Sequence, residues 1–237
     1  MRGSLPTIGR RQAFAYVAGI GLATVWPTAA QKATASQGLL SLPMAGPSSP
    51  DTWWLDQWYG NTAFAYRAPN SFYREGQGLH FGIDFGMVCG TRVVAAADGI
   101  VREVGGPLRA WPLHIAIDHR DLGVTTVYGH LSQSLVTNVG QMVKRGEVIA
   151  ESGDSESFAC DCSPHLHFEV RYDHMRSATN PVPWIPTDWP AVYSPDESSS
   201  FVIDLENPSR WQSIYDQPDV RFGWAHLNEY ERAWVPE

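Results

Sequence analysis

Two short stretches of the sequence combine side chains that could bind a metal ion. One runs from Gly78 to Asp84 and the other from Ser163 to Val170. Imidazole nitrogens and carboxylate oxygens are ordinary zinc ligands, and a catalytic zinc commonly has three protein ligands and one open position. A single histidine is more often an ordinary core or surface residue, but two matched spacings together favour a metal site. The candidate ligands are His80, Asp84 and His167, with His165 as a spare histidine beside them.

The second stretch has the alternation of a β-strand. Successive side chains of a strand face opposite sides, so Leu166, Phe168 and Val170 are expected to point into a core. The other face would carry His165, His167 and Glu169. Residues two apart on a strand lie about 6.6 Å apart, so the two imidazoles could converge on one small site.

The first stretch must bend if it is to contribute two ligands. In a straight strand His80 and Asp84 would lie about 13 Å apart, too far for both to bind one ion at bond lengths of about 2 Å. Glycine tolerates unusual backbone conformations and occupies little space. Gly78, Gly82 and Gly86 therefore permit the bend and leave room beside the ligands.

In their order and spacing these motifs resemble the lysostaphin/LytM-type zinc metallopeptidases. That family carries an H-x-x-x-D motif, matched by His80 and Asp84, and a later H-x-H motif within HLHFE, matched by His165 and His167. A Y-x-H-L segment lies between them and corresponds to Tyr128–Leu131. The resemblance covers roughly Gln77 to Trp184, a little under half of the chain.

The resemblance implies a role for each motif residue. His80, Asp84 and His167 would hold Zn²⁺, His165 would act as general base, and His130 would stabilise the oxyanion. The implied reaction is hydrolysis of a peptide bond in peptidoglycan, either in a stem-peptide cross-link or in a bridge. Groove loops set specificity in such enzymes, so the motifs leave open which bond is cut.

Two other classes of function stay open. A LytM-like regulatory module without catalysis would activate another cell-wall hydrolase, although degenerate members of the family typically lose metal ligands and all the motif positions are present here. An envelope protein with a purely architectural metal would be expected to have a closed site of four ligands.

The remaining pattern predicts an all-β domain. Short apolar runs alternate with turn residues such as Asp98-Gly99 between Phe81 and Trp184. We expect an antiparallel, β-sandwich-like metallopeptidase domain with short loops and with N- and C-terminal extensions. The expected strands are Thr91–Ala95, Ile100–Val104, His114–Asp118, Thr125–His130, Val148–Glu151 and His165–Arg171.

The expected divisions are an export signal over 1–35, a linker and aromatic-rich lead-in over 36–76, the peptidase domain over 77–186, and a Trp/Pro-rich extension over 187–237.

The N-terminal residues indicate export. A basic start that includes Arg10-Arg11 precedes an apolar run from Ala13 to Trp26, and small residues at Ala33–Ala35 provide a cleavage site before Ser36. The run is shorter than the roughly 20 apolar residues of a transmembrane helix. We expect a signal peptide, in one reading of twin-arginine type, leading to the periplasm, envelope or exterior. An uncleaved N-terminal anchor is the alternative, and no stable membrane insertion is expected after cleavage.

Charge excludes some partners. The chain of 237 residues has a formal net charge of −8, and removal of residues 1–35 would take away basic residues and no acidic ones. Such an acidic chain is a poor nucleic-acid binder, so no nucleic acid is expected.

The sequence contains three cysteines, Cys89, Cys160 and Cys162. If the metal site forms, the loops that carry them lie near one another, and an exported protein can form disulfides. We expect one disulfide, from Cys89 to either Cys160 or Cys162.

Two aromatic segments flank the motifs. Asp51–Gly78 precedes them, and it could either pack over the end of the β-domain or wall a substrate groove. The tail from Thr187 to Glu237 carries several Trp and Pro residues. It would dock on the β-domain or form a small accessory unit that touches glycan.

Overall fold

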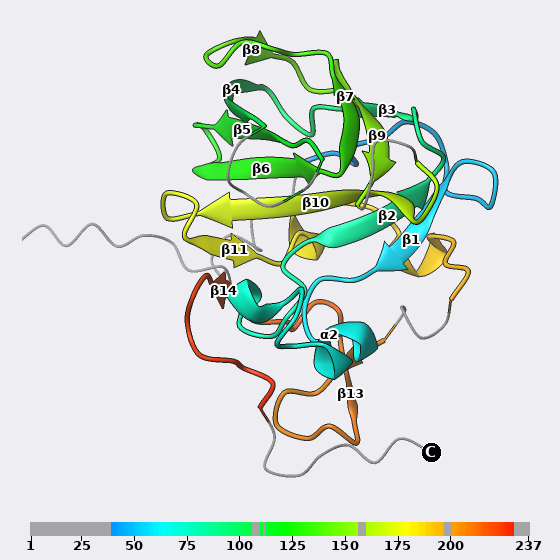
Figure 1. The fold of residues 1–237 in the computed structure, drawn as a ribbon, viewed down its shortest axis with the longest axis vertical. Helices are drawn as coiled ribbons and strands as arrows, with labels where there is room; N and C mark the ends of the chain where they lie inside the picture. Colours follow the sequence, from blue (N-terminus) through cyan, green and yellow to red (C-terminus); the bar gives the residue numbers. More distant parts are fainter. Residues whose placement is uncertain (1–38, 106–109, 111, 156–159, 197–200, 230–237) are drawn as a thin grey trace, which may run out of the picture.

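The computed structural model describes residues 39–105, 110, 112–155, 160–196 and 201–229 (Figure 1). The expected export signal, residues 1–35, lies outside these ranges. None of the helices in the described ranges has the length and apolar character needed to cross a membrane.

The regular secondary structure of the described chain is almost entirely antiparallel β-strand, which confirms the all-β prediction (Figure 1). The strands are β1 (Trp53–Gln57), β2 (Ile83–Met87), β3 (Arg92–Val94), β4 (Gly99–Val104), β5 (Ile115–His119), β6 (Val124–Gly129), β7 (Leu131–Ser134), β8 (Met142–Val143), β9 (Val148–Asp154), β10 (Pro164–Tyr172), β11 (Ser177–Thr179), β12 (Val202–Ile203), β13 (Trp211–Gln212) and β14 (Val220–Arg221). The helical pieces are the short helix α2 (Ala63–Arg67) and single turns at Arg74–Gly76, Val182–Trp184 and Trp189–Ala191.

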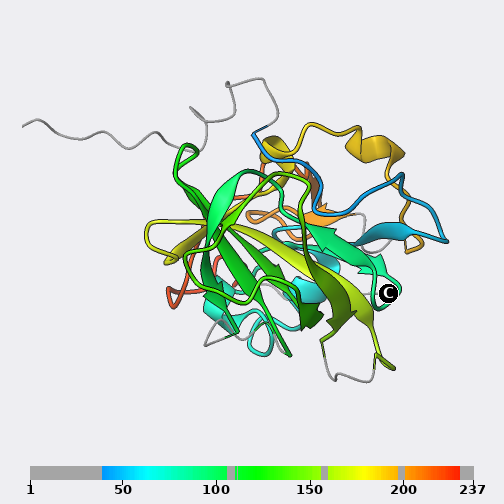
Figure 2. The same cartoon turned by 90° about the horizontal axis from the view of Figure 1, so that it is seen from above.

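The main sheet has the order β1-β2-β10-β6-β5-β4-β8, with β10 near its centre. A smaller group, in which β3 and β7 pair with β9, joins it where β9 pairs with the beginning of β10. Figure 2, which views the molecule from above, shows how these strands curve around one another. Each of the six strands expected from the sequence is present within a few residues of its predicted bounds.

The core lies on one face of β10. Leu166, Phe168 and Val170 are completely buried, as the alternation predicted. They belong to one hydrophobic cluster that runs through the main sheet and includes Phe85 of β2 and Tyr128 of β6. Burial of such side chains stabilises a fold by about 1.5–3 kcal/mol each, so this face fixes the orientation of the whole strand.

Residues 39–50 lie within the expected linker and lead-in, and part of this segment packs against the sheet. Leu40 and Met44 are buried in the core, Ser41 N donates to the carbonyl of Ala96, and Val94 N donates to the carbonyl of Pro43. The few apolar side chains of this segment hold it against the sheet, because their burial outweighs the flexibility of the residues around them.

The lead-in and the C-terminal extension also join the sheet. β1 pairs with β2, and β14 pairs with β11 through the partners Ser177–Arg221 and Ala178–Val220. The hydroxyl of Tyr59 donates to the carbonyl of Pro218, which ties the two segments together. The extension therefore docks on the β-domain in its described part.

Candidate metal centre and substrate groove

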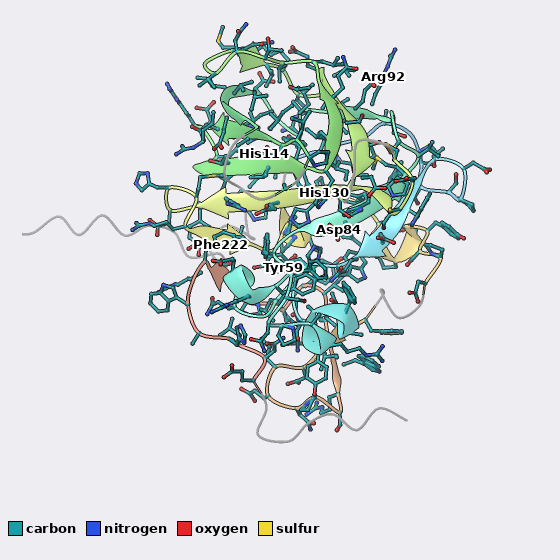
Figure 3. All side chains as sticks on the ribbon, in the orientation of Figure 1. Tyr59, Asp84, Arg92, His114, His130 and Phe222 are labelled. Carbon is teal, nitrogen blue, oxygen red and sulfur yellow. A yellow bond between two sulfur atoms is a disulfide. The ribbon has the colours of Figure 1, made fainter. Side chains whose placement is uncertain are left out.

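The register of three neighbouring strands brings the motif residues together. His167 of β10 lies directly opposite Asp84 of β2 on one side and Gly129 of β6 on the other. Side chains at directly opposed positions share one face, with Cβ atoms about 4.5–5.5 Å apart. His130 follows Gly129, so the Y-x-H-L segment reaches the same place. Figure 3 shows Asp84 and His130 near the middle of the molecule, on either side of β10.

The three expected ligands converge. His167 Nδ1 lies 2.7 Å from Asp84 Oδ1 and 3.2 Å from His80 Nε2, which in turn lies 3.2 Å from Asp84 Oδ2. All three residues are buried, with exposed fractions of 8% or less. Two imidazole nitrogens and a carboxylate in this arrangement could occupy three corners around one ion.

The segment before β2 bends so that His80 and Asp84 meet, which is the geometry that the sequence required of a metal site. His80 precedes the strand and exchanges two backbone hydrogen bonds with Gly60 of the lead-in. His80 Nδ1 donates to the carbonyl oxygen of Trp58 at 2.6 Å. This bond orients the ring with Nε2 toward Asp84, and a carbonyl partner of this kind commonly orients a metal-binding histidine.

The electrostatics of the cluster favour a positive charge. Burial alone would raise the pKa of Asp84, but His80, His167 and His165 outweigh it and hold the pKa well below its usual range. Burial would lower the pKa of His167, but Asp84 and Glu169 raise it to about 9. The carboxylate of Asp84 therefore stays ionised, and the imidazole of His167 retains a proton. A bound cation would take the place of this positive charge.

The donor set fits zinc. Zinc binds imidazole nitrogen and carboxylate oxygen, and a set of two histidines and one carboxylate is known from catalytic sites. Ligand atoms of the three residues lie within 4.8 Å of one another. His80, Asp84 and His167 could therefore hold a zinc ion, and all three line the groove described below.

Glu169 and Arg171 support the site from the same strand face, a contribution that sequence reasoning missed. Glu169 Oε1 lies 3.4 Å from His167 Nε2, too long for a strong hydrogen bond but close enough for electrostatic attraction. The guanidinium of Arg171 donates two hydrogen bonds to the carboxylate of Glu169, one of them from Nη2 at 2.9 Å. Burial would raise the pKa of Glu169, but Arg171 and His167 lower it to about 2. The alternation that marked His165 and His167 also continues through Glu169 and Arg171, and could have found this pair.

The two expected catalytic histidines lie beside the ligands. The ring centroids of His130 and His165 are 4.6 Å apart, and those of His130 and His167 are 5.8 Å apart. His165 Nδ1 donates to the carbonyl of Ser163 at 2.7 Å, which leaves Nε2 as the acceptor nitrogen of the neutral ring. His130 has a φ of 58°, a left-handed conformation that non-glycine residues rarely adopt outside functional or turn positions.

The other buried histidines have structural partners. His119 Nδ1 donates to the carbonyl of Asp98, and its Nε2 lies 2.8 Å from Thr126 Oγ1. His114 Nε2 lies 3.3 Å from Glu103. Neither residue lines the groove described below.

A disulfide joins the two loops near the site. It links Cys89, shortly after β2, to Cys160, with Cα atoms 6.1 Å apart. Cys162 takes no part in it and lies at the surface. Of the two pairings that the sequence left open, the structure contains the one with Cys160.

A groove of about 1610 Å³ passes over the candidate metal centre. The motif residues line it together with residues from outside the resemblance, among them Asp56, Phe64 and Phe72 of the lead-in and Arg221, Phe222 and Trp224 of the extension. Phe64, Phe72 and Trp224 are 54%, 73% and 61% exposed, whereas Trp53, Trp58 and Tyr59 are buried. The sequence left open whether the lead-in packs over the β-domain or walls a groove. In the structure one part of it packs in the core and another part lines the groove.

Comparisons with known proteins agree with this geometry. Residues 78–181 match the model of "Peptidase family M23". An "Uncharacterized metalloprotease" of Haemophilus influenzae is 40% identical over 103 residues, which are 44% of this chain and 20% of that protein. "Glycyl-glycine endopeptidase ALE-1" of Staphylococcus capitis is 30% identical over 147 residues, 61% of this chain and 39% of that protein.

A third relative carries a different functional name. "Murein hydrolase activator NlpD" of Salmonella dublin is 34% identical over 110 residues, which are 46% of this chain and 27% of that protein. The chain spans between about a fifth and two fifths of the length of these three relatives. The segment matched by the family model contains the candidate metal-ligand motifs and confirms the resemblance noted in the sequence, so residues 78–181 form a domain of the peptidase family M23 type, similar to the lysostaphin/LytM group.

Proposed function

We propose that this protein is a zinc-dependent endopeptidase that hydrolyses peptide bonds in peptidoglycan. One observation carries the proposal. The candidate ligand atoms of His80, Asp84 and His167 converge in the lining of the groove, and two more imidazoles, those of His130 and His165, line the same groove. A binding module would need the groove but not this set of acid–base groups.

The three ligands would hold Zn²⁺. When bound there, zinc supplies Lewis-acid polarisation of the scissile carbonyl and lowers the pKa of a water molecule toward about 7. Asp84 contributes one negative charge, and Glu169 adds a second charge behind His167. The charge of Asp84 would favour the cation, while the charge of Glu169 is balanced by Arg171 and acts on His167.

His165 is the proposed general base. Nδ1 of His165 donates its proton in a hydrogen bond to the carbonyl of Ser163, so Nε2 can accept a proton from the attacking water. The protonated ring can then return that proton to the leaving amine. His165 is 8% exposed, so a small part of the ring is open to the groove.

His130 is the proposed oxyanion donor. Its ring stands 4.6 Å from that of His165, centroid to centroid, so both imidazoles can reach one reacting carbonyl. A donor aimed at the developing negative charge lowers the barrier without having to reorganise. The left-handed backbone at His130 turns the chain out of β6 and presents its side chain beside β10.

The proposed substrate is the peptide part of peptidoglycan, in stem-peptide cross-links or bridges, and the proposed location is outside the cytoplasm. One relative is named as a glycyl-glycine endopeptidase and another as an activator of murein hydrolases. The disulfide between Cys89 and Cys160 supports an oxidising compartment, because such bonds persist mainly in exported proteins.

The relative named as an activator supports a second candidate. In that function the groove would bind a partner or the wall, and turnover would belong to another hydrolase. Loss of a ligand would fit that reading, whereas here all three ligands are present and mutually within reach.

Zymography on purified peptidoglycan separates the two functions. The endopeptidase produces clearing by itself, loses it with a chelator and regains it with added zinc. The matched control is His165→Ala, which should fold and bind zinc but produce no clearing. An activator would produce no clearing alone and would increase clearing by an added wall hydrolase.

A further inference from the structure

A tight turn in the C-terminal extension builds one wall of the groove. Trp224 N donates to the carbonyl of Arg221, and Gly223 between them has a φ of 79°. A positive φ at the third position is typical of a type II turn and favours glycine there. The turn brings the indole of Trp224 under the guanidinium of Arg221, whose Cζ lies 4.8 Å from the ring centroid.

Aromatic contacts connect this turn to the metal centre. The ring of Phe222 packs edge-on against Phe81, at 5.3 Å between centroids, and Phe81 packs against the metal-ligand candidate His167 at 5.5 Å. Arg171 lies over the ring of Phe222, with Cζ 4.4 Å from the centroid. Figure 3 shows Phe222 beside β14, away from the upper strands. The wall is therefore continuous from the ligand His167 to the turn.

The backbone of the turn is held firmly. Arg221 N donates to the side-chain oxygen of Gln77 at 2.7 Å, Phe222 N donates to the carbonyl of Arg176, and Gly223 N donates to the carbonyl of Glu75. Gln77 Nε2 donates in turn to the carbonyl of Ala225. The backbone at Arg221 is thus fixed by the segment shortly before His80 and by Arg176 after β10, independently of the Arg221 side chain.

The guanidinium of Arg221 has no carboxylate partner among the described residues. The other two arginines of this region do, since Arg171 pairs with Glu169 and Arg176 pairs with Asp173 at 2.8 Å. The chain carries 25 acidic and 17 basic residues, so an arginine without an acidic partner is not the result of a shortage of carboxylates. Stacking on Trp224 leaves the N–H groups at the edge of the guanidinium available to a ligand.

We propose that Arg221, supported by Trp224, binds a free carboxylate of the peptide substrate and so determines specificity. This inference rests on the proposed function only in requiring that the groove receive a stem peptide. The peptide would lie along Phe222, with its scissile bond near His167 and a carboxylate at Arg221. A planar guanidinium binds a carboxylate through two parallel hydrogen bonds, which an amide cannot reproduce.

The test is equilibrium binding of two soluble stem peptides to the full-length, zinc-loaded protein. One peptide has its carboxylates free and the other has them amidated. The measurements are made in the His165→Ala background, so that neither peptide is consumed. The expected preference for the free peptide is about 10- to 100-fold, the scale of a hydrogen bond between charged groups.

Three substitutions are compared. Arg221→Gln should remove the preference, while Arg221→Lys should keep part of it because the charge remains. The matched control is Arg92→Gln, because Arg92 is an exposed arginine on β3 outside the groove (Figure 3) and should leave the preference unchanged. Zinc content and the thermal unfolding midpoint show whether each variant is folded.

Each contrary result has a distinct meaning. Equal binding of the two peptides, binding of neither, or an unchanged preference in a folded Arg221→Gln variant would overturn the inference. Because binding needs no turnover, these results are independent of whether the protein cleaves peptidoglycan. Trp224 could instead stack against sugar rings. In that case Trp224→Ala would weaken binding of the disaccharide conjugates of both peptides equally, and Arg221→Gln would leave the affinity for both conjugates unchanged. That result would also overturn the inference.

Discussion

The imidazole of His167 lies so close to Gly82 that position 82 has no room for a side chain. A Cβ there would be 2.6 Å from Cε1 and 2.7 Å from Nε2 of His167, and 2.8 Å from the carbonyl oxygen of Phe168. Cβ atoms do not approach other atoms this closely, so the ring or the backbone of β10 would have to move. The absence of a side chain at Gly82 is therefore needed for the position of His167 in the candidate metal centre.

The first prediction follows from this contact. Gly82→Ala should lower zinc affinity by about 10- to 100-fold, the usual effect of disturbing a group that orients a ligand. Competition with a chromophoric chelator measures the affinity. Thermal unfolding of the metal-free protein serves as the control for global damage. An unchanged zinc affinity in a folded variant would show that His167 does not bind the ion.

The second prediction separates ligand from catalyst on β10. His167→Ala should lose zinc and activity together. His165→Ala should keep most of its zinc while turnover falls by about 10²–10⁴-fold, the scale of a lost general base. His130→Ala should likewise keep zinc and lose about 10²–10³-fold in rate. Zinc content and cleavage rate are measured on the same preparations, and complete zinc loss in His165→Ala would contradict the assignment.

Much of the site was predictable from local sequence pattern. The alternation through Leu166, His167 and Phe168 is a property of neighbouring residues, so it predicted both the strand and the faces of its side chains. The spacing from His80 to Asp84 required a bend, and the glycines beside them indicated where the space would be.

What the sequence did not predict depends on pairings between distant segments. β1 pairs with β2, and the residues Trp53–Gln57 do not by themselves indicate which strand is their partner. Phe222 contacts Phe81 across a long sequence separation, and no local pattern indicates that contact. The burial of Leu40 and Met44 has a similar origin, since they become core residues only when the sheet provides a surface for them.

The third prediction concerns pH. Burial lowers the pKa of His119, which stays neutral in the fold while it hydrogen-bonds the carbonyl of Asp98. In the unfolded chain its pKa is about 6.5, so the unfolded state takes up the proton first as the pH falls. The free energy of unfolding should therefore decrease below about pH 6.5.

Urea unfolding of the metal-free protein at pH 7.5 and pH 5 measures this effect. His119→Gln removes the titrating group, so its stability should decrease less between the two pH values than that of the unaltered protein. An equal decrease in both would mean that another group is responsible.

The fourth prediction concerns the disulfide. Cys89 and Cys160 are 71 residues apart, and closing a loop of that length stabilises a fold by about 4 kcal/mol in the chain-entropy model. Reduction, or the double substitution Cys89→Ser with Cys160→Ser, should lower the free energy of unfolding by an amount of that order. Cys162→Ser is the matched control and should have little effect, because Cys162 lies outside the bond. Equal losses in both variants would contradict the pairing.

The most direct test of the proposed activity is mass spectrometry of muropeptides after digestion of purified peptidoglycan with the zinc-loaded protein. The expected result is the loss of one class of cross-linked muropeptide and the appearance of two products that together contain one additional water molecule. The identity of the products would also name the bond that is cut. An unchanged muropeptide profile, from protein that carries about one zinc ion per chain, would contradict the assignment of this site as a peptidase.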